Sequence, residues 1–215
     1  MDTVFDVFSP TLVLAPHVDD GEFGCGGTIS KLIENGINVY YVAFSAAEDS
    51  VPDGFPKDIL RKEVVDATKL LGLERDNVTV LRYPVRRFLE YRQDILEDMI
   101  QIGHTIQPSV VFCPSRHDIH QDHWVIANEA VRAFKHGSIF GYEMPWNNLS
   151  VDTTAFVPLD ESHVSAKLKA LECYMSQKFR SYIEPDFIKS LARVRGAQIG
   201  EPYAEIFEVV RLVIR

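Results

Sequence analysis

Residues 12–22 read LVLAPHVDDGE, and this stretch decides the fold of the chain. Its first four residues form the short apolar run that is typical of a buried strand. A histidine, two adjacent aspartates and a glutamate follow almost at once. Because open α/β sheets bind their ligands at the carboxyl ends of strands, the stretch predicts a central strand that runs directly into a functional site.

A second polar cluster, DIHQDH, occupies residues 118–123 and follows the strand-like run 110–113. Two such clusters at the ends of two strands can converge on one ion. Two histidines and a carboxylate are a usual ligand set for catalytic zinc, with positions left open for water and substrate. We therefore expect His17, Asp20 and His123 to hold one metal ion, with Fe²⁺ or Co²⁺ as alternatives to Zn²⁺.

Three further residues of these clusters are candidates for catalysis. Asp19 adjoins a ligand and can accept the proton of an attacking water, although a helix-capping role is the alternative. His120 precedes His123 by one helical turn, and a protonated imidazole there would stabilise an oxyanion and protonate a leaving amine. Asp122 is expected to orient a catalytic histidine from behind. The alternative for His120 and Asp122 is that both are ordinary surface residues.

The hydrophobic pattern alternates between strands and helices along the chain, which predicts an α/β fold with a mostly parallel sheet flanked by helices. Gly24–Gly27 is expected to form a tight turn and helix start. A single domain over 1–215 is expected, with a core of about 1–145 and a C-terminal α+β extension of about 146–215. The expected strands are 11–15, 39–44, 78–81, 110–113, 138–142 and 205–214; the expected helices are 28–35, 57–71, 91–106, 121–134, 162–178 and 185–193, with a turn-rich loop at 145–158.

Composition narrows the class of protein. The 215 residues carry a net charge of −9, which argues against nonspecific nucleic-acid binding because that requires a basic surface. No apolar stretch approaches the roughly 20 residues of a membrane helix, and no secretory signal is visible. Three widely spaced cysteines fit a reducing compartment. We expect a cytoplasmic protein with a small-molecule or glycoconjugate substrate and no membrane insertion, and the sequence leaves a homo-oligomer open.

The remaining histidines and the tryptophans carry weaker signals. His104, His117, His136 and His163 lack a comparable context and are expected at the surface. Trp124 and Trp146 lie close in sequence to the site and are expected either to stack on a sugar or to pack in the core or rim.

Taken together, the motifs resemble the LmbE-like or PIG-L family of zinc-dependent de-N-acetylases. The match spans nearly the whole chain in the family's order. It rests on HVDD at 17–20, GCGGT at 24–28 and HQDH at 120–123, with weaker support from RKE at 61–63, KAL at 169–171, SQ at 176–177, RG at 195–196 and YAE at 203–205.

The resemblance implies a Rossmann-like fold and hydrolysis of the acetamide of N-acetylglucosamine units on small molecules, glycolipids or glycoconjugates. It implies that His17, Asp20 and His123 bind zinc and that Asp19 is the general base. His120 would be the oxyanion stabiliser or acid with Asp122 behind it, and Arg61 would contact the sugar.

The chain departs from the family pattern at three positions. Val18 replaces the usual proline after the histidine, and Gly21 stands where many members have glutamate. Neither change removes a ligand, so they are expected to alter the shape of the loop. Tyr174 stands where many members have a histidine, which removes any role of that histidine here.

We therefore expect a zinc-dependent hydrolase that removes the acetyl group from an N-acetylated amino sugar. Two alternatives remain at this stage. One is an amidase acting on a larger acyl amide, and the other is a non-catalytic sugar- or nucleotide-binding protein on the same fold. The presence of all three ligands, the base and His120 favours an enzyme.

Overall fold

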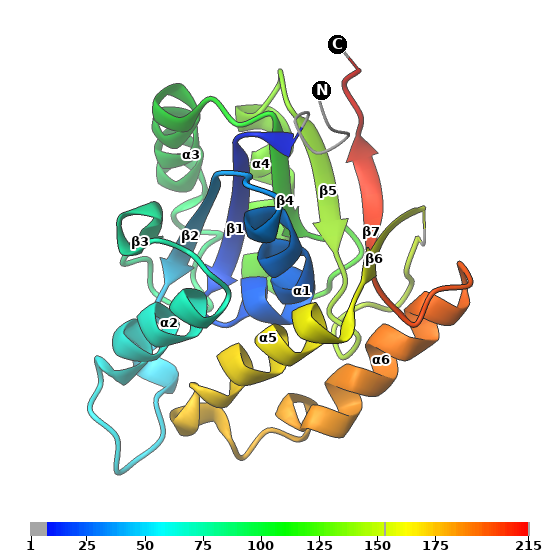
Figure 1. The fold of residues 1–215 in the computed structure, drawn as a ribbon. Helices are drawn as coiled ribbons and strands as arrows, with labels where there is room; N and C mark the ends of the chain where they lie inside the picture. The colour runs from blue at the N-terminus through cyan, green and yellow to red at the C-terminus, as the bar shows by residue number, and fades with distance from the viewer. Residues whose placement is uncertain (1–7, 153, 215) are drawn as a thin grey trace.

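The computed structural model describes residues 8–152 and 154–214, which fold around one seven-stranded sheet (Figure 1). The strand order is β3-β2-β1-β4-β5-β7-β6, with the first five strands parallel and the last two antiparallel to their neighbours. The strands are β1 (Thr11–His17), β2 (Val39–Ser45), β3 (Val78–Val80), β4 (Val110–Pro114), β5 (Ser138–Tyr142), β6 (Ala155–Leu159) and β7 (Tyr203–Arg211).

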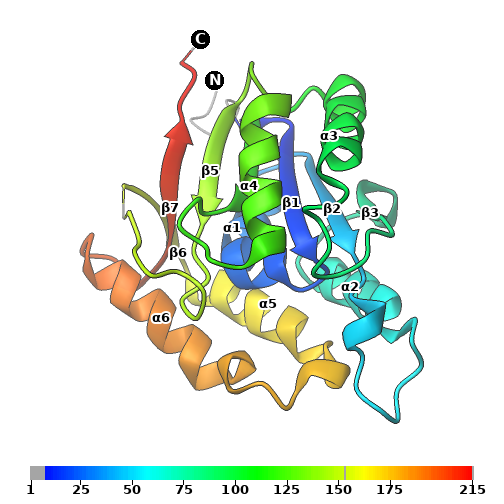
Figure 2. The same cartoon turned by 180° about the vertical axis from the view of Figure 1, so that it is seen from behind.

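Helices cover both faces of the sheet because its central strands are apolar on both sides. One face packs against α1, α2 and α5, and the other against α3 and α4 (Figures 1 and 2). Helix α6 packs beside β7. The helices are α1 (Asp20–Glu34), α2 (Ile59–Leu70), α3 (Arg92–Ile106), α4 (Gln121–Ala133), α5 (Glu161–Glu172) and α6 (Pro185–Ala197).

The adjacency of β1 and β4 determines where a ligand can bind. From β1 the chain builds β2 and β3 on one side, and then returns to place β4 and β5 on the other. The strand order therefore reverses between β1 and β4, and a crevice opens beyond their carboxyl ends at such a point. Both polar clusters of the sequence follow these two strands.

The structure confirms the expected α/β class and mostly parallel sheet, and it corrects several local expectations. Residues 145–158 were expected to form a loop, but β6 (Ala155–Leu159) pairs with β7 at the edge of the sheet. Pro158 lies within β6, and a proline is tolerated there because an edge strand does not need every N–H for pairing. The division into a core and an extension stays a prediction.

Helix α1 begins at Asp20 rather than at Thr28, and it is kinked at Cys25. The backbone N–H groups of Gly27 and Thr28 beyond the kink donate to the Glu205 carboxylate, at 3.0 and 2.7 Å. Glu205 thus caps the second half of the helix from β7. The expected turn at Gly24–Gly27 is therefore a kink inside a longer helix.

Two details of the α5 region also differ from expectation. His163 was expected at the surface but is buried. Both of its ring nitrogens have partners there, since Nδ1 accepts a hydrogen bond from the Asp160 N–H and Nε2 contacts the Glu34 carboxylate. Helix α5 ends at Glu172, and a 3₁₀ turn, η4 (Met175–Gln177), follows it. The early end of α5 turns the chain back toward the carboxyl end of β1.

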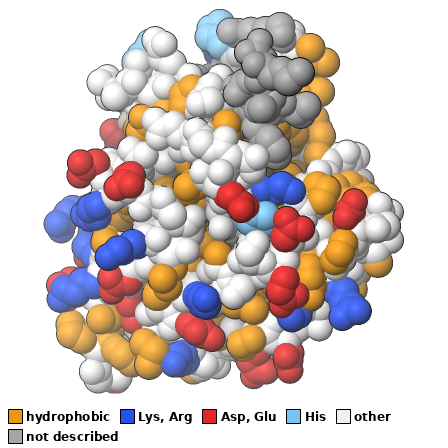
Figure 3. All heavy atoms as spheres, viewed as in Figure 1, with side chains coloured by type: hydrophobic (Ala, Val, Ile, Leu, Met, Phe, Trp, Pro, Cys, Tyr) orange, Lys and Arg blue, Asp and Glu red, His pale blue; other side chains and the backbone are white. Residues whose placement is uncertain are grey.

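Acidic and basic side chains are interspersed on the face shown in Figure 3, and neither sign dominates a large area of it. Among the described residues, no helix is long and apolar enough to cross a membrane.

The three departures from the family pattern meet in one buried network at the start of α1. Gly21 leaves room for Tyr41 of β2, since a Cβ there would lie 2.4 Å from the tyrosine ring. The Tyr41 and Tyr174 hydroxyls donate to the Glu22 carboxylate at 2.5 and 2.7 Å, and both lie within hydrogen-bond distance of the Val18 carbonyl. Burial raises the pKa of Glu22 to about 8, although both tyrosine bonds act in the opposite direction.

We predict that the free energy of unfolding of Glu22→Gln increases relative to that of wild type as pH rises. The folded state keeps a proton on Glu22 up to about pH 8, whereas the unfolded chain releases it near pH 4.5. The contribution of Glu22 to stability is therefore full below pH 4.5 and declines up to about pH 8. Glutamine does not titrate, so the stability difference between variant and wild type should grow across that window by roughly a few kcal/mol.

Urea unfolding of both proteins between pH 5 and 9 measures this difference, with Glu97→Gln on the exposed face of α3 as the control. A difference that does not change with pH would show that Glu22 is ionised in the folded protein.

Candidate metal centre and active site

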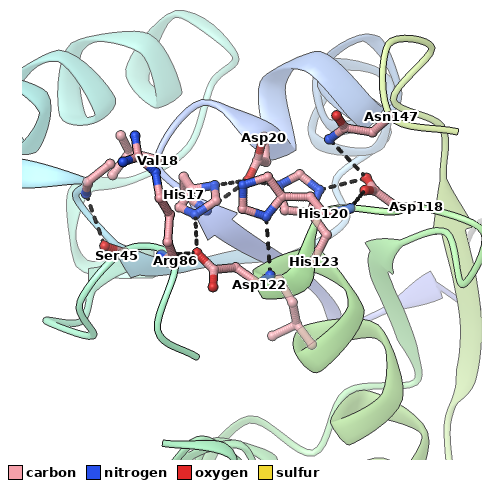
Figure 4. Close-up of polar contacts among 12 residues, drawn as sticks. His17, Val18, Asp20, Ser45, Arg86, Asp118, His120, Asp122, His123 and Asn147 are labelled. Atoms are coloured by element: carbon pink, nitrogen blue, oxygen red, sulfur yellow. Dashed lines mark hydrogen bonds and ion pairs between the residues drawn. The ribbon is translucent and has the colours of Figure 1, made fainter. Parts of the chain in front are cut away.

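Three side chains converge at the carboxyl ends of β1 and β4 (Figure 4). His17 is the last residue of β1, Asp20 the first of α1, and His123 lies in the first turn of α4. Asp20 Oδ2 lies 3.1 Å from His17 Nδ1 and 3.2 Å from His123 Nε2. One ligand atom from each lies within 4.8 Å of the others. The structure thus brings together all three residues that the sequence analysis assigned to the metal.

A second carboxylate holds each of these imidazole rings from behind. Asp118 Oδ2 lies 2.7 Å from His123 Nδ1, and Asp122 Oδ2 lies 3.0 Å from His17 Nε2. Each histidine therefore turns its other nitrogen toward Asp20. Carboxylates that orient ligating histidines in this way are typical of metal sites. The donor set and its second carboxylates fit a zinc ion.

Asp122 lies behind a different histidine from the one expected. Its carboxylate contacts His17 and accepts bonds from the backbone N–H groups of Arg86 and Phe88, rather than contacting the ring of His120. Ligand atoms of a second group, His17, His120 and Asp122, also lie within 4.8 Å of one another. In this group His17 and Asp122 are already hydrogen-bonded to each other.

The charges of the cluster also fit a cation. Burial would raise the pKa of Asp20, but His123 and His17 hold it well below its usual range. Burial would lower the pKa of both histidines, yet Asp20 and the second carboxylates raise it to about 8 for His17 and about 10 for His123. The carboxylates around the two imidazoles therefore stabilise positive charge at this point, as a metal site must.

Asp19 occupies the N-cap position of α1, but its side chain makes no capping hydrogen bond. The side chain lines the pocket next to the metal cluster instead. Burial and the neighbouring Asp20 raise the pKa of Asp19, while Arg180 and His17 act in the opposite direction. The Asp19 side chain therefore does not cap the helix, and its role as a base stays a prediction.

His120 precedes α4 and also lines the pocket. Its Nδ1 accepts the backbone N–H of Asp122 at 3.2 Å, so a neutral ring carries its proton on Nε2. Burial and the two ligand histidines lower the pKa of His120 to about 4. A neutral His120 would therefore offer Nε2–H as a hydrogen-bond donor, and the two expected roles, oxyanion stabiliser and acid, stay predictions.

The pocket over this cluster has a volume of about 200 Å³. Its far wall comes from the segment after α5, which the sequence analysis did not assign to the site. Tyr182 of this segment stacks on Trp146 from the loop between β5 and β6, with ring centroids 4.0 Å apart, and the Arg180 guanidinium donates to the Tyr182 hydroxyl. Gln177 completes this wall. Of the two tryptophans, Trp146 is thus the one that lines the pocket.

Arg180 and Tyr182 belong to no motif of the sequence and follow His123 by more than fifty positions, so nothing in the sequence connected them with the site. Gln177 belongs to the SQ pair and Trp146 was a candidate, but neither could be placed in the pocket wall from the sequence. Asp118 was within reach, since it belongs to the DIHQDH cluster and precedes His123 by five residues.

Arg61 lies on α2, and its side chain is committed to structural partners. Its guanidinium donates to Glu48 at 2.6 Å and to the carbonyls of Val80 and Leu81 at 3.1 and 3.0 Å. The neighbouring Leu60 lines the pocket, and Arg61 does not. Its role as a sugar contact stays a prediction.

The chain is similar in sequence to a known family of proteins. The family model PIG-L, described as GlcNAc-PI de-N-acetylase, matches residues 12–135, a range that contains both polar clusters. The uncharacterized deacetylase YaiS of Escherichia coli K12 is 29% identical over 170 residues, which span 77% of this chain and 90% of that protein.

Two solved structures share the fold. The conserved protein TT1542 of Thermus thermophilus has a TM-score of 0.80 and 26% identity, covering 96% of this chain and 97% of its own. The N,N'-diacetylchitobiose deacetylase of Pyrococcus horikoshii has a TM-score of 0.79 and 25% identity, covering 93% and 83%.

We predict that Asp118→Asn weakens zinc binding by about 10-fold or more, because loss of a carboxylate behind a ligating histidine typically has an effect of that size. The substitution keeps the size of the side chain and removes the charge that fixes the His123 ring. Competition with a chromophoric chelator gives the zinc affinity. The control is Asp98→Asn on α3, which changes a carboxylate that accepts a hydrogen bond from the Tyr83 hydroxyl. Equal zinc affinity in Asp118→Asn and wild type would contradict this role for Asp118.

Proposed function

This chain belongs to the PIG-L family of de-N-acetylases, and from that premise we propose that it is a zinc-dependent hydrolase that removes the acetyl group from an N-acetylated amino sugar. The observation that carries the proposal is the convergence of His17, Asp20 and His123 in one pocket that Asp19 and His120 also line. Ligands, a base and a hydrogen-bond donor together are what amide hydrolysis requires.

When zinc is bound by His17, Asp20 and His123, it supplies Lewis acidity that lowers the pKa of water and polarises the amide carbonyl. The second carboxylates Asp118 and Asp122 keep the two imidazoles in the orientation that this binding needs. The remaining chemistry falls to side chains of this chain.

Asp19 is the general base in this proposal. It takes one proton from the attacking water as the water oxygen bonds to the acetyl carbon, and it returns that proton to the nitrogen as the carbon–nitrogen bond breaks. The second proton of the water also passes to the nitrogen, so the products are acetate and the protonated amine. Burial of Asp19, which raises its pKa, suits a group that must hold a proton between the two steps.

His120 stabilises the negative charge that develops on the carbonyl oxygen. Its Nδ1 is held by the Asp122 N–H, which leaves Nε2–H as the donor. A donor fixed in place before the reaction needs no reorganisation when the charge develops, and this accounts for much of its catalytic effect.

The sugar substrate is supported by the relatives and by the pocket. The Pyrococcus horikoshii protein is a deacetylase of N,N'-diacetylchitobiose, and YaiS is named as a deacetylase. The pocket of about 200 Å³ is lined by polar side chains together with the rings of Trp146 and Tyr182, a combination that suits a sugar. We place the protein in the cytoplasm, because Cys25, Cys113 and Cys173 are all free.

Acetate release from N-acetylglucosamine, N,N'-diacetylchitobiose and nucleotide-linked N-acetyl sugars tests the proposal, with N-butyryl-glucosamine as the longer acyl. Wild type should release acetate, lose activity in chelator and regain it with zinc. Asp19→Asn should keep zinc and lose about 10²–10⁴ of kcat, because an amide cannot accept the proton. Chelator-insensitive turnover would exclude a metal enzyme, and faster cleavage of the butyryl amide would favour a larger-acyl amidase.

We predict that His120→Ala retains zinc and lowers kcat by about 10²–10³ with little change in KM, because the hydrogen bond strengthens only in the transition state. Elemental analysis and steady-state kinetics on the best substrate of the screen measure both. Loss of zinc from the variant would instead make His120 a ligand, as in the grouping with His17 and Asp122.

A further inference from the structure

The side chain of Gln177 places a buried hydrogen-bond acceptor in the pocket wall. Gln177 ends the 3₁₀ turn η4, is 2% exposed and lines the pocket over the metal cluster. Within the described residues, its Oε1 has no hydrogen-bond partner. A buried acceptor without a partner is unfavourable for folding, and this one belongs to a residue of the pocket wall, where a bound ligand would supply the missing donor.

The neighbouring residue fixes which way the Gln177 amide points. Gln177 Nε2 donates to Ser176 Oγ at 3.2 Å. The Ser176 hydroxyl has a single proton, and it donates that proton to Glu63 Oε2 at 2.6 Å. Ser176 Oγ can therefore only accept from Gln177, which requires the NH₂ group of the amide to face it. The oxygen of the amide is left as the free acceptor.

Glu63 of α2 anchors this arrangement to the core. Its carboxylate is buried and accepts both the backbone N–H of Ser176, at 3.0 Å, and the Ser176 hydroxyl. Glu63 of the RKE segment and the SQ pair at 176–177, which had no assigned role, are thus joined by one polar network. The network runs from α2 through Ser176 to the pocket.

The rest of the wall suits a carbohydrate. Gln177 shares it with the stacked rings of Trp146 and Tyr182, which present apolar area beside a polar acceptor. A sugar ring has the same combination, since its C–H groups and its hydroxyls lie close together. A hydroxyl is also a strong donor for an amide oxygen.

We propose that Gln177 is a specificity residue whose Oε1 accepts a hydrogen bond from a ring hydroxyl of the substrate, and that Glu63 and Ser176 are positioning residues that aim it. The proposal rests on the proposed function, because it concerns the sugar bound at the same site. It assigns the C-terminal segment after α5 to substrate recognition rather than to catalysis.

The experiment measures kcat/KM for acetate release from N-acetylglucosamine and from its 3-, 4- and 6-deoxy analogues. Gln177→Ala should lower kcat/KM for the parent sugar by about 5- to 100-fold, the range for loss of one buried hydrogen bond. On the analogue that lacks the donating hydroxyl, wild type and Gln177→Ala should be equal. Gln101→Ala on α3 is the matched control and should match wild type on every sugar.

Ser176→Ala tests the positioning role. It should lower kcat/KM for the parent sugar less than Gln177→Ala does, and in the Gln177→Ala background it should cause no further loss, since both changes remove the same interaction. Thermal unfolding and zinc content of each variant establish that the fold and the metal site are intact.

Three outcomes would contradict the inference. Activity of Gln177→Ala equal to that of wild type on the parent sugar would overturn it while leaving the proposed function intact. An equal loss on all deoxy analogues would also overturn it, because the partner would then be the amide N–H or a non-specific packing contact. If wild type releases no acetate from any N-acetyl sugar, the proposed function fails, and this inference fails with it.

Discussion

The burial of the Asp20 carboxylate between two imidazoles is the interaction on which the rest of the site depends. A carboxylate that is removed from water is costly unless it is paired. Asp20 is paired with His17 and His123, and each of these is in turn held by another carboxylate. Because the charges alternate outward from Asp20, removal of either histidine takes away one of the two partners of Asp20 and also the imidazole partner of the carboxylate behind that histidine. This constraint explains why so many ionisable groups can remain buried at one end of the sheet.

The sheet makes this pairing possible. His17 and the chain after β4 come from distant parts of the sequence, and they meet only because β1 and β4 are adjacent parallel strands. Parallel strands present their carboxyl ends on one edge, and the reversal of strand order between β1 and β4 opens space there. The fold therefore supplies the position of the site, while the polar residues at the strand ends supply its chemistry.

Buried acids attach the C-terminal elements to this core. Glu22 bonds to Tyr174, Glu205 of β7 caps the second half of α1, and Glu63 holds Ser176. These three networks bring the segment after α5 and strand β7 against α1 and α2. The same contacts that stabilise the fold thus place the far wall of the pocket opposite the metal cluster.

The α/β class, the succession of helices and strands along the chain, and the polar clusters that contain His17, Asp20 and His123 could be recognised from the sequence alone, because hydrophobic periodicity and short motifs are local properties. The sequence did not determine β6, whose pairing depends on a partner strand about fifty residues away, or the kink in α1, which Glu205 stabilises from β7. Only the tertiary structure shows that Asp122 pairs with His17. The same holds for the pocket wall, which is formed by Gln177, Arg180 and Tyr182. Each of these depends on which distant residue lies within hydrogen-bond distance, and that is settled only when the helices pack on the sheet.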